Sequence, residues 1–156
     1  MREGFDRRVV LGGLATSALT PAFAAPDKWK ALGEDVRAQM AWAWAAYKDR
    51  CFGADQIKPA SGAGEAFFFP KGPAMGLSIV EALDTLYVMG LDTEVEQGVR
   101  WVADNLRFDI DGEVQVFETG IRMVGGLLSA WHGTHEKKLL ALAKDLTDRL
   151  SPAFTK

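Results

Sequence analysis

The sequence is poor in cysteine and histidine: Cys51 is the only cysteine, and His132 and His135 are the only histidines, among 156 residues. A single cysteine cannot form an internal disulfide, so an apolar core must hold the fold. A cysteine–histidine nucleophile is disfavoured because both histidines lie far along the chain, and we interpret Cys51 as a small, half-buried apolar residue. The histidines and Glu136 lack nearby third and fourth ligands, which indicates surface loop residues rather than a metal site.

Basic residues are not in excess either, and there is no run of like charges and no glycine-rich phosphate loop. The formal net charge is −3, with 25% charged and 48% hydrophobic residues. These values are typical of a soluble globular chain of about one domain. Without a basic surface, nucleic-acid binding through phosphate neutralisation is disfavoured. Composition gives no indication of oligomeric state.

No apolar run near the N-terminus is long enough to span a bilayer, so stable membrane insertion is not expected. Arg7 and Arg8 precede an apolar run over residues 9–19, and small residues favour cleavage after Ala24. This pattern predicts an export signal over residues 1–25 that resembles a twin-arginine signal. An ordinary Sec signal with two incidental arginines is the alternative. Both predict an exported bacterial protein, periplasmic or secreted.

Alternation of strands and helices is absent, whereas apolar residues recur at helical spacing in five segments. The predicted helices cover about residues 27–50, 75–89, 93–106, 116–131 and 136–150. Glycines and prolines in residues 51–74 predict a long loop, and the apolar residues Phe67, Phe68 and Phe69 indicate that it packs against something. Thr93 to Glu96 has the form of a capping box. Short connections between the later helices predict antiparallel hairpins, so the fold class is all-α.

Aromatic residues are concentrated in the first predicted helix. Its large apolar residues recur at helical spacing, which favours a buried stripe. They are Trp29, Leu32, Val36, Met40, Trp44 and Tyr47. The alternative is an exposed face whose rings, with that of Trp42, stack on sugars, since the C–H faces of sugars suit aromatic surfaces.

Two charged residues, Glu118 and Arg122, interrupt an apolar segment over residues 114–131. Their spacing places them on one face of a helix. A solvated ion pair worth ~0.3–0.5 kcal/mol is the simplest interpretation. The apolar neighbours of the pair leave little solvent-facing surface for it, which favours a functional site instead. These neighbours are Val116, Phe117, Ile121 and Val124.

Several blocks of the sequence resemble, in the same order, glycoside hydrolase family 47, the class I α-mannosidases. The blocks cover residues 41–47, 53–59, 80–91, 116–122, 125–130 and 148–154. The resemblance implies paired antiparallel helices forming the first part of an (α/α)7 barrel, with residues 26–156 as part of the catalytic domain. It also implies a calcium-dependent glycosidase that removes α-1,2-linked mannose from α-mannoside oligosaccharides with inversion.

Residue roles follow from the same resemblance. Glu118 matches the general acid, Arg122 matches an arginine that contacts the acid and the bound sugar, and Asp84 matches an acidic position with a structural or pocket role. Inverting hydrolysis pairs a carboxylic acid with a carboxylate base ~6.5–9.5 Å away, which leaves room for a water. An acid working near neutral pH needs a raised pKa, and a nearby cation opposes this. The benefit of Arg122 would therefore be positioning and binding.

The sequence also departs from the family pattern. The resemblance places the catalytic base and a calcium-binding threonine in helix pairs without a counterpart here, so no metal ligand is expected within residues 1–156. We interpret the sequence as an N-terminal portion that is inactive alone. Gly120 and residues 61–73 differ from the family pattern, which bears on sugar specificity. The alternative function is a non-catalytic helical module that binds a glycan or a protein partner.

Overall fold

The computed structural model describes residues 26–69 and 72–154, so the predicted export signal lies outside the described residues. The chain divides into two units, Met1–Ala38 and Gln39–Lys156. Helix α2 (Pro26–Cys51) confirms the first predicted helix, and its residues are divided between the two units. None of the helices in the described ranges is long and apolar enough to cross a membrane.

The predicted aromatic stripe of α2 is only partly correct. Within the first unit, three of its members are exposed: Trp29, Leu32 and Val36. Within the second unit, Trp44 and Tyr47 are buried, because this part of α2 packs against the remaining helices. Helical spacing alone predicted one continuous buried face, but a face is buried only where a partner element covers it.

The described residues between 51 and 74, which are 51–69 and 72–74, form a structured connection rather than a simple loop. Strands β1 (Gln56–Ile57) and β2 (Gly64–Glu65) pair antiparallel, with Gln56 opposite Glu65. The sequence did not predict this hairpin because two-residue strands are too short to show alternation. Phe67, Phe68 and Phe69 pack against the buried core, as the sequence predicted. The connection therefore brings an apolar segment back to the helices.

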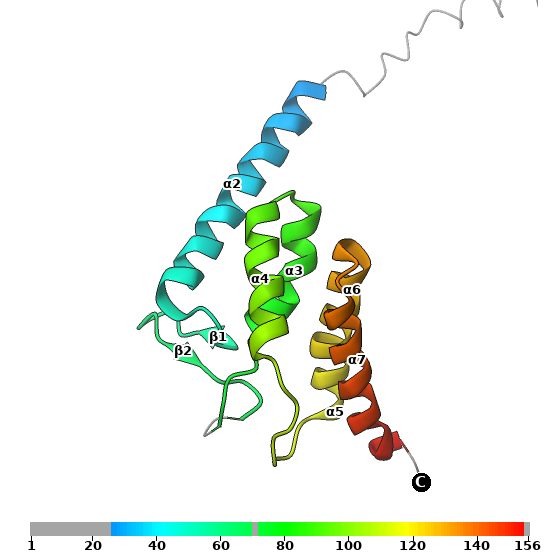
Figure 1. Cartoon of the computed structure of the whole chain (residues 1–156). Coiled ribbons are helices and arrows are strands. Elements are labelled where there is room, and N and C mark those ends of the chain that lie inside the picture. Colours follow the sequence, from blue (N-terminus) through cyan, green and yellow to red (C-terminus); the bar gives the residue numbers. More distant parts are fainter. Residues whose placement is uncertain (1–25, 70–71, 155–156) are drawn as a thin grey trace, which may run out of the picture. The chain divides into compact units, whose positions relative to one another are not determined.

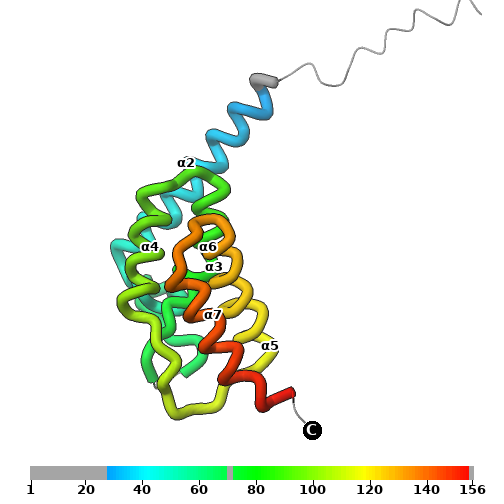
Figure 2. Tube along the Cα trace, turned by 45° about the vertical axis from the view of Figure 1, so that its right-hand side comes forward, coloured from blue at the N-terminus to red at the C-terminus, as the bar shows by residue number. Residues whose placement is uncertain are grey.

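Four helices form two antiparallel hairpins, which lie side by side in Figure 1 and Figure 2. The first pairs α3 (Leu77–Val88) with α4 (Asp92–Asn105), and the second pairs α6 (Gly125–Thr134) with α7 (Lys137–Leu150). The bounds of α3, α4 and α7 agree closely with the predicted helices. A short 3-10 turn, η2 (Ser151–Phe154), follows α7.

The predicted capping box at the start of α4 is wrong. The N-cap residue is Leu91, and no side chain caps this end. Glu94 is instead engaged by α2: Trp44 Nε1 donates to its Oε2 at 3.0 Å, and Lys48 Nζ lies 2.7 Å from the same oxygen. Glu96, the carboxylate that a capping box starting at Thr93 would use, is exposed.

Helix α3 is the centre of the described core. Its buried residues face both α4 and α6, which explains why its sequence is apolar on several sides. They are Leu77, Ile79, Val80, Leu83 and Leu86. Gly126 allows α6 to approach closely, because a Cβ there would lie 2.8 Å from Cγ1 of Val80 and 3.0 Å from its carbonyl oxygen. Helix α3, which carries Asp84, is thus held close to α6, which directly follows the turn that carries Arg122.

Candidate active site

The fourth predicted helix is continuous but changes its winding where the candidate residues lie. Helix α5 (Val116–Glu118) leads into a π-helical turn, η1 (Thr119–Val124), which continues as α6. At the end of η1 the Gly125 amide donates to the Gly120 carbonyl, five residues back. Turns of this kind occur frequently at functional sites. The prediction of a helix is confirmed, but its winding is not regularly α-helical.

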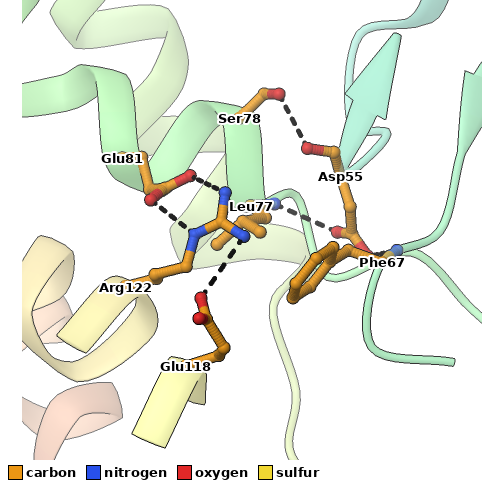
Figure 3. Close-up of polar contacts among 7 residues, drawn as sticks. All are labelled: Asp55, Phe67, Leu77, Ser78, Glu81, Glu118 and Arg122. Carbon is orange, nitrogen blue, oxygen red and sulfur yellow. Dashed lines mark hydrogen bonds and ion pairs between the residues drawn. The ribbon is translucent and has the colours of Figure 1, made fainter. Parts of the chain in front are cut away.

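Arg122 lies within η1 and has its main partner on another helix. Its Nε and Nη2 donate to the two carboxylate oxygens of Glu81 on α3, each at 2.7 Å. Its Nη1 lies 3.8 Å from Oε2 of Glu118, which is an ion pair but too long for a hydrogen bond. Figure 3 shows the guanidinium between the two carboxylates. The sequence predicted the weaker of these two contacts.

The guanidinium of Arg122 also lies over an aromatic ring. The guanidinium carbon of Arg122 lies 4.6 Å from the centroid of the Phe67 ring, within the range of a cation–π interaction. Hydrogen bonding by Glu81 is the main cause that raises the pKa of Arg122, and the charges of Glu81 and Glu118 add to this, whereas burial opposes it. Arg122 therefore stays cationic, and Glu81 of α3 orients its guanidinium group.

The surroundings of the pair are less apolar than the sequence indicated. The side chains of Glu118 and Arg122 are 31% and 27% exposed. Phe117 and Ile121 are themselves 67% and 55% exposed, so they do not shield the pair from solvent. Within η1, Thr119 and Met123 are the buried residues. The charged pair thus belongs to the solvent-facing side of the turn, where a ligand has access.

The sequence profile of Glycosyl hydrolase family 47 matches residues 39–156. This chain belongs to glycosyl hydrolase family 47. A mannosyl-oligosaccharide 1,2-alpha-mannosidase of Arabidopsis thaliana is 39% identical over 145 residues, which cover 92% of this chain and 25% of that protein. Mannosyl-oligosaccharide 1,2-alpha-mannosidase IB of Homo sapiens is 40% identical over 121 residues, covering 78% of this chain and 19% of that protein.

Among solved structures, the alpha-1,2-mannosidase from Trichoderma reesei matches with a TM-score of 0.57 at 26% identity. The match covers 76% of this chain and 25% of that structure. The chain thus spans a quarter or less of the length of these family 47 relatives. Its paired antiparallel helices belong to the (α/α)7 barrel fold, which confirms the predicted fold class.

Asp84, the third candidate residue from the family 47 resemblance, has hydrogen-bond partners other than Arg122. Its Oδ2 accepts a hydrogen bond from Ser129 Oγ at 3.0 Å, and its Oδ1 accepts one from Thr85 Oγ1 at 3.3 Å. Because Ser129 is on α6 and Asp84 is on α3, this carboxylate ties the two helices together. These contacts support its interpretation as a structural residue.

The remaining candidates do not form a site in the described part of this family 47 chain. No group of three His, Cys, Asp or Glu residues there is arranged to hold a metal ion. Cys51 is half-buried, and burial raises the pKa of its thiol, which disfavours a nucleophilic thiolate. His135 has a left-handed backbone (φ 57°) at the end of α6 and is exposed, as expected of a turn residue.

Three contributors to the site did not stand out in the sequence. Glu81 lies within the family-like block of residues 80–91 but was given no role, and Phe67 was given only a packing role. Asp55 was not singled out, although its side chain is 1% exposed and accepts hydrogen bonds from three backbone amides. The acidic residue in the block of residues 53–59 was the only available signal for it.

Proposed function

We propose that the protein containing this chain is an exported α-mannosidase that removes α-1,2-linked mannose from α-mannoside oligosaccharides with inversion of configuration. The arrangement of Glu118 at the end of α5 and Arg122 on η1, with Glu81 of α3 opposite them, carries the proposal. It places a carboxyl group and an oriented cation on an accessible face of a family 47 chain. Relatives named as 1,2-alpha-mannosidases support the substrate class.

In this proposal Glu118 is the general acid and protonates the leaving oxygen of the glycosidic bond. Arg122 binds the sugar and positions it. The 3.8 Å separation between Arg122 Nη1 and Glu118 Oε2 leaves the carboxyl group free to hydrogen bond to substrate or water. Glu81 takes the two strong hydrogen bonds of the guanidinium and so fixes its plane.

Inverting hydrolysis also needs a carboxylate base, and the base is not assigned to a residue of this chain. Calcium dependence is proposed from the family resemblance alone. Among the described residues no three His, Cys, Asp or Glu side chains are grouped to hold a metal ion, and no step is assigned to calcium here. Export rests on the arginine pair, apolar run and cleavage pattern of residues 1–25.

The decisive test is Glu118→Gln in the natural full-length product of the gene. Release of mannose from an α-1,2-linked mannobiose should fall by a factor of roughly 10²–10⁴, the usual contribution of a positioned acid. Binding of the disaccharide should be largely preserved, because the amide keeps the size and hydrogen-bonding capacity of the side chain. Glu96→Gln, an exposed glutamate on α4, is the matched control and should keep normal turnover. Near-normal turnover by Glu118→Gln would overturn the acid assignment.

A further inference from the structure

Asp55 is a buried carboxylate with an unusual set of partners. Its side chain is 1% exposed, and such a group requires several hydrogen bonds to offset the loss of water. Its Oδ2 accepts from the Phe67 amide at 2.7 Å, and its Oδ1 accepts from the amides of Met75 and Leu77 at 2.6 and 3.1 Å. Its carbonyl oxygen accepts from Ser78 Oγ at 2.7 Å. One residue therefore fixes both ends of the segment from 67 to 77.

Each end of that segment supports Arg122. At one end, the ring of Phe67 lies against the guanidinium at 4.6 Å. At the other end, Asp55 takes the place of a side-chain cap for α3, since the N-cap residue Gly76 provides none and the Leu77 amide bonds to Asp55 instead. Glu81, which binds the guanidinium in two places, follows one turn later on α3.

We propose that Asp55 is a positioning residue for Arg122. By holding the Phe67 backbone it keeps the ring against the guanidinium, and by holding the start of α3 it fixes the carboxylate of Glu81 (Figure 3). Both contacts with Arg122 are directional, so a shift of either partner turns the cation relative to the bound sugar. The inference rests on the proposed function, in which Arg122 binds that sugar.

The two carboxylate oxygens of Asp55 allow its two tasks to be separated. In Asp55→Asn, the side-chain oxygen can still accept hydrogen bonds from the amides of Met75 and Leu77. This orientation is favoured because it keeps two hydrogen bonds, whereas the reverse orientation would keep one. The new NH2 group then faces the Phe67 amide, so a donor meets a donor and that anchor is lost. Phe67→Leu removes the ring while leaving an apolar side chain. These variants disturb the same support in two different ways.

The experiment is a double-mutant cycle of Asp55→Asn and Phe67→Leu in the natural full-length product, assayed on an α-1,2-linked mannobiose well below the unfolding temperature. Each single variant should raise KM about tenfold, with kcat changed by less than about twofold, because oriented sugar binding is lost and proton transfer is not. The double variant should be no worse than Phe67→Leu alone, since Asp55 acts through the ring. A KM unchanged in Asp55→Asn, or fully additive losses, would overturn the proposal.

Two further measurements separate positioning from a general loss of structure. Ser78→Ala removes another hydrogen bond to Asp55 but leaves the Phe67 anchor, so its KM should stay normal. A KM raised as much as in Asp55→Asn would contradict the proposal. The second measurement is the hydrogen-exchange rate of Arg122 Nε–H by NMR on arginine-labelled protein. Exchange should be several-fold faster in Asp55→Asn, because the hydrogen bond from Nε to Glu81 is then less well oriented.

The exchange measurement also keeps the two proposals apart. If the wild-type protein releases no mannose from the disaccharide, the proposed function fails, and the exchange rate alone decides the role of Asp55. Faster exchange in Asp55→Asn then supports positioning of Arg122, and an unchanged rate overturns it. If the wild-type protein is active, the kinetic cycle and the exchange rate must agree for the proposal to hold.

Discussion

Arg122 should be coupled far more strongly to Glu81 than to Glu118, although only Glu118 is close to it in the sequence. The perturbation is a pair of double-mutant cycles, in which Arg122→Gln is combined with Glu81→Gln or with Glu118→Gln. The guanidinium forms two hydrogen bonds of 2.7 Å with Glu81. Its contact with Glu118 is a single ion pair, with 3.8 Å between Arg122 Nη1 and Glu118 Oε2. Glutamine removes each charge and keeps the size of the glutamates, so the cycles isolate the pairwise interactions.

The magnitude follows from geometry and exposure. Charge-assisted hydrogen bonds contribute about 1.5–3 kcal/mol each where they are buried, and exposed ion pairs contribute about 0.2–1 kcal/mol. The side chains of Arg122 and Glu81 are 27% and 37% exposed, so solvent screens much of the interaction. We therefore expect a coupling of about 1–1.5 kcal/mol with Glu81. The coupling with Glu118 should be about 0.3–0.5 kcal/mol, the range for spacing of four along a helix.

The assay is urea unfolding followed by circular dichroism at low ionic strength, with the free energy of unfolding extrapolated for each variant. Both couplings should fall in about 0.5 M salt, where screening is stronger. A control cycle on Lys144 and Asp148 of α7, which are also four residues apart and are 74% and 64% exposed, should show a coupling no larger than that between Arg122 and Glu118. Equal couplings of Arg122 to the two glutamates, or a larger one to Glu118, would refute this account of the site.

Two further predictions concern stability. Gly126→Ala should lower the free energy of unfolding by about 1–3 kcal/mol, because the new methyl group would meet Val80 at 2.8 Å, whereas Gly120→Ala, which has open space, should be tolerated. Thermal unfolding of both variants checks this, and equal losses would contradict it. Burial raises the pKa of Tyr47 to about 12. The unfolded chain therefore loses this proton first as pH rises from about 10, so stability should fall between about pH 10 and 12, less so in Tyr47→Phe. Parallel pH profiles of the two proteins would be the contrary result.

The helices could be predicted because their signals are local. Apolar residues at helical spacing in α3 and α7 correspond to buried side chains, such as Leu83 and Leu142. Helix α3 ends before Gly90, which has a left-handed backbone (φ 64°), and glycine is the residue type most common at that position after a helix. Where a signal needed a partner element, prediction failed: the stripe of α2 is exposed at Trp29 and buried at Trp44.

The site could be predicted only in part for the same reason. Spacing identified Arg122 and paired it with Glu118, which is four residues away, but its main partner Glu81 is 41 residues away. A spacing rule describes neighbours on one helix and contains no information about a second helix. Asp55 was missed because its partners are backbone amides, which have no signature in the sequence.

The packing of Gly126 against Val80 links the two helical segments that carry Arg122 and Glu81. Gly126 lies one helical turn after Arg122, and Val80, against which it packs, directly precedes Glu81. The close approach of α6 to α3 at this glycine therefore also sets the distance that the guanidinium must span. A side chain at 126 would separate the helices beside the ion pair, so Gly126→Ala should reduce the coupling between Arg122 and Glu81 as well as stability. The site thus depends on a residue with no side chain, whose effect is transmitted through the helix that carries the carboxylate.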